Sequence, residues 1–283
     1  MGKKRWAIVI IAVLLAAIAA WVIWANKALE VTEYSVHSEK IPAAFDGFRI
    51  AQISDLHNDS FGENNCKLLD SLRGTGPDII VITGDLVDSR RTDFDIGLDF
   101  VRRALEIAPV YYVPGNHEAR LTEYDVFKQD LINTGVSVMD NKKATLIRDD
   151  NTVTLMGVND PHFSYSLPPV EEGDLIYDAV SGIQETSDGY TVLLSHRPDL
   201  LDAYARTGVD LVLSGHAHGG QFRIPFVGGI FAPDQGLFPK YDVGRYTQGN
   251  TTLIVSRGLG ASVIPLRINN RPEIVVVTLK SGS

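Results

Sequence analysis

Cysteine is almost absent from this chain, since Cys66 is the only one among 283 residues. A single cysteine excludes an internal disulfide, which agrees with a reducing compartment and equally with an exported protein that relies on its core. We expect Cys66 itself to serve packing. The composition, with 45% hydrophobic and 22% charged residues, excludes the disordered, collagen-like and disulfide-stapled classes.

Basic residues are also scarce, because 26 Lys and Arg stand against 35 Asp and Glu. The first thirty residues hold four cations and one anion, so the rest of the chain carries a formal charge of −12 rather than the −9 of the whole. A body this acidic repels a phosphate backbone. We therefore expect no nucleic-acid binding unless bound metal ions change the local sign.

One long apolar run lies near the N-terminus, from Trp6 to Trp24, without a charge, Gly or Pro. As a helix it would be about 28 Å long, close to the ~30 Å hydrocarbon core of a bilayer. The basic MGKKR run precedes it and indoles mark both ends, so the positive-inside rule predicts a single-pass membrane anchor with a cytoplasmic N-terminus and an extracytoplasmic body. A signal peptide cleaved near Ala17-Ile18-Ala19 and a buried core helix are the alternatives, but the run is longer than a usual signal core.

Beyond the anchor, short β-branched runs that end in polar turns alternate with amphipathic stretches, and this alternation predicts an α/β fold. We divide the chain into a cytoplasmic basic tail and anchor (1–27), a polar connector (28–47) and one domain (48–283). Strands are expected at 48–53, 79–82, 110–113, 153–158, 191–194, 211–213, 253–255 and 274–279, and helices at 64–73, 94–107, 124–133 and 198–206. Gly74, Gly135 and Gly208 are expected to cap helices, and the last strands to pair antiparallel.

Five of the polar turns carry side chains typical of metal ligands, and they follow the first, second, third, fifth and sixth of these runs. They are Ser54-Asp55-Leu56-His57, Gly84-Asp85-Leu86-Val87-Asp88, Gly115-Asn116-His117-Glu118, Ser195-His196 and Gly215-His216-Ala217-His218. Because ligands bind beyond the carboxyl ends of strands in open α/β sheets, we expect the turns to converge on one crevice. A donor set of Asp, Asn and His without thiolate suits Mn, Fe, Zn or Ni better than it suits Ca. It also differs from a structural zinc site, which is rich in Cys. Seven candidates exceed the needs of one ion, so two divalent metal ions that share a carboxylate fit the count.

In this order the blocks DLH, GDLVD, GNHE, SHRP and GHAH make the sequence similar to the calcineurin-like metallophosphoesterases. The strings GHAHGGQ, SRGLGAS and PLRINNRPEI, with the anchor in front, resemble the membrane-anchored branch of YaeI- and YkuE-like phosphodiesterases. One block arises readily by chance, whereas five in order at strand ends are a strong signal. The resemblance implies a metallophosphoesterase-type αββα sandwich, with two mixed β-sheets flanked by helices, preceded by one N-terminal transmembrane helix.

The resemblance also implies a role for each residue of the blocks. One ion would be held by Asp55, His57, Asp85 and His218. Asp85 would bridge to a second ion, whose other ligands would be Asn116, His196 and His216. His117 is left as general acid or transition-state stabiliser. Asp88 and Glu118 are expected to accept the free N–H of ligating imidazoles.

Residues outside the blocks give weaker signals. Arg197, Arg257 and Arg267 could each fork a substrate phosphate or pair equally well with carboxylates, and Arg257 is our substrate-binding candidate. We expect no functional role for His37 and His162. Specificity should lie in the loops 160–174 and 223–243.

Together these features predict a membrane-anchored dinuclear-metal phosphoesterase that works by in-line attack of a metal-bound water or hydroxide. The preference for phosphodiesters rests on the resemblance alone. A lipid-linked or envelope-derived phosphoester fits, because the anchor raises the local concentration of such substrates. The alternatives are a lipid-linked nucleotide-sugar (UDP-diacylglucosamine-type) pyrophosphatase, which needs a cytoplasmic site, a protein phosphatase, and a non-catalytic metal-bound binding module.

Overall fold

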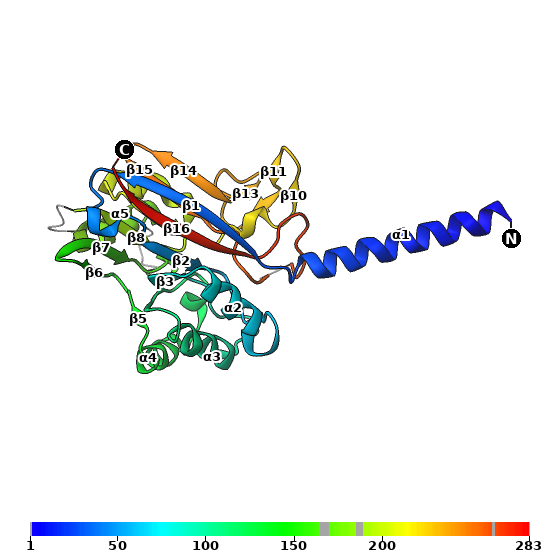
Figure 1. The fold of residues 1–283 in the computed structure, drawn as a ribbon, viewed down its shortest axis with the longest axis horizontal. Coiled ribbons are helices and arrows are strands. Elements are labelled where there is room, and N and C mark those ends of the chain that lie inside the picture. The colour runs from blue at the N-terminus through cyan, green and yellow to red at the C-terminus, as the bar shows by residue number, and fades with distance from the viewer. Residues whose placement is uncertain (1, 165–169, 185–188, 262–263, 283) are drawn as a thin grey trace.

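Two mixed β-sheets form the centre of the molecule (Figure 1), as the sequence predicted. The computed structural model describes residues 2–164, 170–184, 189–261 and 264–282. The first sheet runs in the order β1 (Glu30–Ser38), β16 (Glu273–Ser281), β2 (Arg49–Ile53), β3 (Ile79–Thr83), β4 (Val110–Val113) and β5 (Ser137–Val138). The second runs in the order β14 (Gly244–Gln248), β15 (Thr251–Val255), β9 (Leu211–Ser214), β8 (Thr191–Leu194), β7 (Asn151–Gly157) and β6 (Lys142–Arg148). The antiparallel pairing expected late in the chain is found for β14 with β15 and for β16 with β2.

Three apolar clusters hold four layers together. The cluster between the sheets joins buried side chains of both, such as Val81 of β3 and Leu155 of β7. A second cluster packs the first sheet on the helices α2 (Cys66–Gly74), α3 (Phe94–Ala104) and α4 (Tyr124–Thr134). The third packs the second sheet on α5 (Glu172–Gln184) and α6 (Leu201–Thr207). Helices thus cover both outer faces, and the expected αββα sandwich is confirmed.

Helix ends follow the glycine pattern at two of three positions. Gly135 and Gly208 adopt left-handed φ values of 104° and 75° and cap α4 and α6, because glycine reaches this region without a Cβ penalty. The prediction for Gly74 was wrong by one residue, since Gly74 is still helical and Thr75 caps α2. The loop expected at 223–243 holds two small hairpins, formed by β10 (Arg223–Ile224) with β11 (Gly228–Gly229) and by β12 (Phe231–Ala232) with β13 (Gly236–Leu237).

Residues 28–47 form part of the first sheet rather than the polar connector that the sequence suggested. They contain β1 and a short 3₁₀ helix, Ala43–Phe45. β1 pairs in parallel with β16 from Glu30 opposite Glu273 to Ser38 opposite Ser281. Local pattern could not reveal this, because the partner strand lies at the other end of the chain. The domain therefore begins at β1, and only residues 26–29 separate it from the N-terminal helix.

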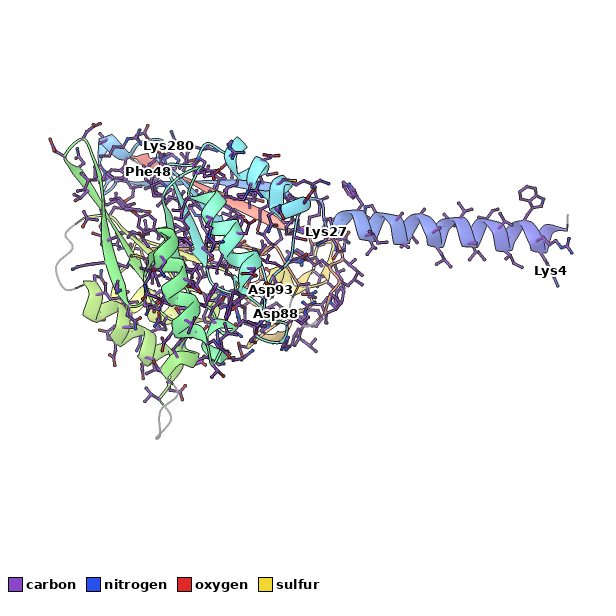
Figure 2. All side chains as sticks on the ribbon, turned by 90° about the horizontal axis from the view of Figure 1, so that it is seen from below. Lys4, Lys27, Phe48, Asp88, Asp93 and Lys280 are labelled. Carbon is purple, nitrogen blue, oxygen red and sulfur yellow. The ribbon has the colours of Figure 1, made fainter. Side chains whose placement is uncertain are left out.

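The N-terminal helix α1 (Lys3–Ala25) projects from one end of the domain (Figure 1). Its segment Lys4–Ala25 is long and apolar enough to cross a membrane by length and composition, and none of its apolar stretch is buried in the fold. Figure 2 places Lys27 at the junction of helix and domain, with Phe48 and Lys280 at the opposite end of the domain. The buried core-helix alternative is therefore excluded.

Candidate metal centre

The five polar turns meet at one edge of the sandwich. They follow β2, β3 and β4, which are neighbours in the first sheet, and β8 and β9, which are neighbours in the second. Gln52 of β2 ties the two sheets together at this edge, because its amide nitrogen donates to Ser214 O of β9 at 2.9 Å and to Thr83 Oγ1 of β3 at 3.0 Å. The seven expected metal ligands are each at most 5% exposed.

The backbone of these turns is strained. Five site residues have φ between 47° and 67°, in the left-handed region, and they are Asp55, His57, Asp85, His216 and His218. A non-glycine residue there costs roughly 1–3 kcal/mol, and such strain clusters at functional sites. The surrounding turns hold it in place, since Asp55 N–H donates to Gly84 O and His57 N–H donates to Asp85 O, both at 3.0 Å.

Glycine is required beside His216. A Cβ on Gly215 would collide with the side chains of Ser54 and Asp55. Without that Cβ, the β9 turn approaches closely enough for His216 N–H to donate to both carboxylate oxygens of Asp55, at 3.1 and 3.0 Å. The GHAH turn and the DLH turn are thereby fixed to each other.

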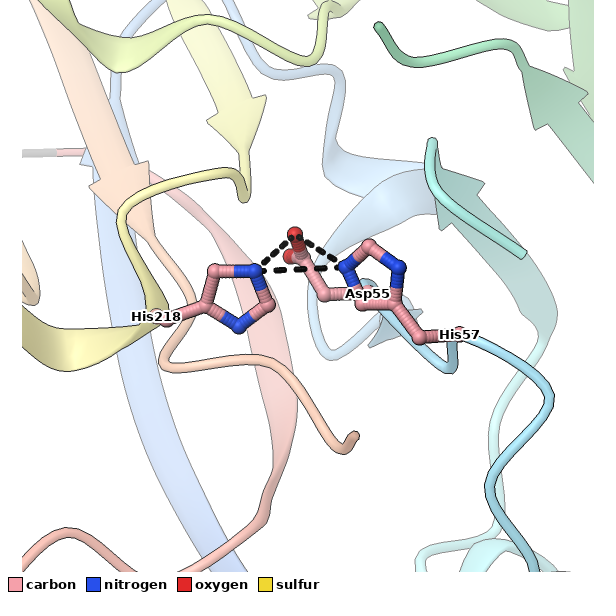
Figure 3. A group of neighbouring side chains, drawn as sticks. All are labelled: Asp55, His57 and His218. Atoms are coloured by element: carbon pink, nitrogen blue, oxygen red, sulfur yellow. Dashed lines mark hydrogen bonds and ion pairs between the residues drawn. The ribbon is translucent and has the colours of Figure 1, made fainter. Parts of the chain in front are cut away.

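One group of ligand atoms comes from Asp55, His57 and His218 (Figure 3). His57 Nε2 lies 3.2 Å from His218 Nε2, and Asp55 Oδ1 lies 3.8 Å from the first and 3.5 Å from the second. Donors about 2.0–2.2 Å from one divalent ion lie about 3–3.5 Å apart, so these atoms are spaced nearly as such an ion needs.

The second group joins Asp85, Asn116, His196 and His216. The Asn116 side-chain oxygen lies 3.1 Å from His196 Nε2, and His216 Nδ1 lies 3.1 Å from the same nitrogen. In this position the Asn116 oxygen faces only atoms that accept, so turning the amide round would improve its hydrogen bonds. Acceptor atoms that converge in this way repel one another when alone and are what a cation binds. The residues present therefore fit a metal ion.

Asp85 stands between the two groups. Its Oδ2 lies 3.4 Å from His57 Nε2 and 3.3 Å from His196 Nε2. Its other oxygen accepts from His117 N–H at 2.9 Å, which fixes the carboxylate orientation. One carboxylate oxygen is thus shared by two converging sets of nitrogen donors.

Electrostatics show that the cluster favours positive charge. Burial lowers the pKa of His57 well below its usual value and that of His218 to about 4, so both imidazoles are neutral with a lone pair to offer. Burial would also lower the pKa of His196, but Asp85 outweighs it and raises that pKa to about 10. Burial would raise the pKa of Asp85, yet His196 and His117 hold it well below its usual range. A cation at His196 Nε2 would displace a proton from that atom, because only the neutral imidazole offers a lone pair.

Two of the candidate ligand imidazoles are oriented by acceptors behind them. His196 Nδ1 lies 2.8 Å from Thr83 O, and His216 Nε2 lies 2.8 Å from Asp234 Oδ2. These contacts leave His196 Nε2 and His216 Nδ1 as the atoms with free lone pairs. Arg197 Nη2 lies 3.3 Å from the same Asp234 oxygen. Sequence reasoning missed Asp234, and only its place in the loop 223–243 hinted at it.

His117 lies beside the first group, with its ring edge-on to that of His57 at a centroid distance of 4.5 Å. Ser89 N–H donates to His117 Nδ1 at 3.1 Å, so a neutral ring carries its proton on Nε2. Asp88 Oδ1 lies 3.5 Å from the same Nδ1. Asp88 therefore contacts His117, rather than a ligating imidazole as the sequence suggested.

Glu118 also has partners other than those expected. Its carboxylate accepts from the backbone N–H groups of Gly115 at 2.7 Å, Asp85 at 2.9 Å and Val87 at 3.1 Å. Burial and the nearby Asp85 raise the pKa of Glu118. Its contacts tie the GDLVD turn to the GNHE turn, and the expectation that it accepts an imidazole N–H was wrong.

The substrate-binding role expected for Arg257 does not agree with its contacts. Its Nη2 lies 2.8 Å from Glu273 Oε1 and 3.4 Å from Glu30 Oε2, so the guanidinium is used within the first sheet. Arg197 is likewise buried against carboxylates, among them Glu172 at 3.1 Å. Arg267 Nη2 lies 3.3 Å from His218 Nδ1, next to a candidate ligand.

Two other arginines line the site. A cavity of about 200 Å³ is bordered by Asp85, Asn116, His117, His216 and His218 together with Arg90, Arg120, Pro233 and Asp234. Arg90 and Arg120 follow the GDLVD and GNHE blocks by two residues each, which is the signal that could have found them. His37 is exposed on β1, and His162 Nδ1 lies 2.8 Å from Asp160 Oδ1 and 3.4 Å from Arg197 Nη1.

Known proteins are similar to this chain in sequence. The calcineurin-like phosphoesterase family profile matches residues 48–220. The metallophosphoesterase YkuE of Bacillus subtilis, described as uncharacterized, is 34% identical over 89% of this chain and 86% of its own length. Phosphodiesterase YaeI of Escherichia coli is 29% identical over 82% of each chain. A transmembrane protein with a metallophosphoesterase domain from Danio rerio is 26% identical over 89% of this chain and 58% of its own length.

Proposed function

The chain belongs to the calcineurin-like phosphoesterase family and is a metal-dependent phosphoester hydrolase, and on this premise we propose that it is a membrane-anchored phosphodiesterase with two metal ions. The observation that carries the proposal is the position of Asp85 Oδ2, within 3.4 Å of both His57 Nε2 and His196 Nε2. A carboxylate so placed can serve two cations at once.

The ligand assignment follows the two groups of donor atoms. Asp55, His57, Asp85 and His218 would hold one cation. Asp85, Asn116, His196 and His216 would hold the other. When bound, two such ions supply Lewis-acid charge for the phosphoryl oxygens and lower the pKa of a water at the site. The imidazole, amide and carboxylate donors favour Mn, Fe, Zn or Ni.

His117 is the group that can move a proton. Because Ser89 N–H donates to Nδ1, a neutral ring carries its proton on Nε2, and this proton can be given to the departing alkoxide oxygen. Arg90 and Arg120 border the same cavity and can pair with the phosphoryl oxygens that carry the growing charge. Asp234 and Thr83 O keep the imidazoles of His216 and His196 in the orientation that ligation needs.

The choice of a phosphodiester is supported by the similarity to phosphodiesterase YaeI. Membrane anchoring is supported by the apolar, unburied α1 and by the transmembrane relative. The basic residues before α1 favour a cytoplasmic N-terminus and an extracytoplasmic domain. A substrate that is lipid-linked or derived from the cell envelope would then lie within reach of the site.

Full-length protein in detergent, stripped with a chelator and reloaded with Mn, Fe, Zn or Ni singly, tests the proposal. We expect about two ions per chain and faster turnover of bis(4-nitrophenyl) phosphate than of 4-nitrophenyl phosphate. Asp210→Asn is the matched control for Asp85→Asn, since Asp210 is a buried carboxylate that accepts from Thr191 outside the cluster. One ion per chain, or preference for the monoester, would overturn the assignment.

A further inference from the structure

Exposed apolar side chains gather at the end of the domain from which α1 projects. Of the fifteen large apolar residues described as exposed beyond α1, nine lie in the segments 224–238 and 264–268. We define the apolar rim as Phe226, Val227, Leu237, Phe238, Leu266 and Ile268, with Phe226 fully exposed. Single exposed apolar residues need no explanation, but a contiguous group marks an interaction surface.

The two segments of the rim are joined to each other by backbone pairing. Arg223 N–H donates to Ile268 O at 3.0 Å, and Phe222 forms a parallel β-bridge with Ile268. Figure 1 shows β10, β11 and β13 at the α1 end of the domain. The rim is therefore one surface.

The end of α1 is fixed to this same surface. Asn26 Nδ2 donates to Arg267 O at 2.9 Å, and Arg267 N–H donates back to Asn26 Oδ1 at 2.7 Å. Arg271 donates to Ala28 O and Leu29 O at 3.0 and 2.7 Å, and its guanidinium lies 5.4 Å from the Trp24 ring centroid. Leu266 and Ile268, the neighbours of Arg267 in the chain, therefore lie close to the end of α1.

A second pocket lies between the end of α1 and the metal centre. It has a volume of about 450 Å³ and is lined by Asn26, Lys27 and Arg91 at one side and by His57 of the metal centre. Ile96, Leu259 and Pro265 give it an apolar lining. Pro265 lies between Ile264 and Leu266, which are both exposed. His57 Nδ1 has no hydrogen-bond partner among the described residues. Lys27, Arg91 and Arg267 outnumber the carboxylates Asp59 and Asp93 in the lining, and this charge together with the apolar walls suits an amphipathic phosphate.

We infer that the apolar rim rests in the interfacial region of the bilayer that α1 spans, so that this pocket opens at the lipid surface and admits a phosphodiester whose alkyl or acyl chains remain in the membrane. The inference rests on the proposed phosphodiesterase function. A span leaving the bilayer at Trp24 brings Leu266 and Ile268 to the headgroup level, where apolar side chains gain from burial. Lys27 and Arg91 pair with Asp59 and Asp88, but their side chains are 52% and 66% exposed and can also reach a lipid phosphate.

Contact with the membrane can be measured on the full chain in phosphatidylcholine vesicles. In a Cys66→Ser background, Val227→Cys is labelled with an environment-sensitive nitrobenzoxadiazole dye, and Ile147→Cys, 72% exposed on β6, is the matched control. We expect emission at position 227 to rise by about twofold or more on reconstitution, since the dye leaves water, and emission at 147 to stay unchanged. Equal behaviour of the two positions would overturn the inference.

The substrate class is tested with two diesters that share one leaving group. Methyl 4-nitrophenyl phosphate is soluble, whereas hexadecyl 4-nitrophenyl phosphate resides in the vesicle. In both, water adds to phosphorus, the bond to the nitrophenyl oxygen breaks, and 4-nitrophenol and an alkyl phosphate leave. We expect the double variant Phe226→Asp, Val227→Asp to lose about tenfold on the hexadecyl diester and nothing on the methyl diester, while Ile147→Asp changes neither.

The outcomes distinguish failure of the membrane contact from failure of the phosphodiesterase function. Equal rates for both diesters that respond equally to the rim variant would overturn the inference and leave the phosphodiesterase function standing. Absence of turnover of both diesters by the metal-loaded wild type would instead refute the proposed function.

Discussion

His117→Ala should lower kcat by about 10²–10⁴, the range for loss of a general acid, which corresponds to roughly 2.7–5.4 kcal/mol of transition-state stabilisation. The structure supports this size because the ring is only 3% exposed and its Nδ1 accepts from Ser89 N–H, which leaves the proton on Nε2. His117 is not among the seven expected metal ligands. Metal content of the variant should therefore equal that of the wild type by elemental analysis.

The leaving group tells which role His117 has. A proton donor matters little when the leaving oxygen is already a weak base, so the loss should shrink from alkyl to 4-nitrophenyl esters. A residue that stabilises phosphoryl charge would slow good and poor leaving groups alike. Steady-state rates for a series of aryl and alkyl phosphodiesters, at matched metal occupancy, distinguish the two.

Two further variants separate chemistry from structure. His117→Asn keeps a side-chain oxygen that can accept from Ser89 N–H but has no Nε2 proton, so it should be as slow as His117→Ala. His37→Ala, at an exposed position on β1, should keep full activity. Unchanged rates for both His117 variants across the whole ester series would remove His117 from the mechanism.

Asp85→Asn should lower both bound metal and turnover, because Asp85 Oδ2 faces the nitrogen atoms of both groups. The control Asp210→Asn should lower neither. Normal metal occupancy of Asp85→Asn by elemental analysis would refute the two-metal assignment. Asp234→Ala should weaken binding of one cation by about 10–100-fold, the usual cost of losing the acceptor behind a ligating imidazole, since Asp234 holds His216 Nε2 at 2.8 Å. Metal titration followed by calorimetry would show one weakened and one unchanged site, and two unchanged sites would contradict the role of Asp234. A reporter fused to the C-terminus should be active only outside the cytoplasm, and added protease should release the domain from spheroplasts. A protected domain would reverse the orientation and favour the cytoplasmic pyrophosphatase alternative.

Much of the fold was readable because it depends on local pattern. The strands β2, β3 and β4 are short, continuous apolar runs, and each is followed by a polar turn. Right-handed connections place such consecutive parallel strands side by side, so their carboxyl ends must meet at one edge. The sequence alone therefore placed the Asp, Asn and His side chains of the blocks in one cluster.

The strand within residues 28–47 and the partners of the charged side chains could not be predicted from the sequence. β1 alternates in burial like many exposed segments, and only its pairing with β16, more than 200 residues later, makes it a strand. Glu118 could have met an imidazole, but the fold brings three backbone N–H groups within 3.1 Å of it. Arg257 could have met a phosphate, but Glu273 and Glu30 lie nearer.

The physical reason is the difference between interactions that are local in the sequence and contacts between distant segments. Apolar periodicity and local backbone preference depend on neighbours along the chain, so apolar runs, helix caps and the long N-terminal span can be read from the sequence. A long charged side chain binds whichever opposite charge or amide the tertiary structure brings within about 3 Å, and that partner can come from any segment. For this reason the sequence determined which residues gather in the candidate metal centre, while only the folded chain decided that Asp234 contacts His216 and that one pocket is lined by His57 and by residues at the end of α1.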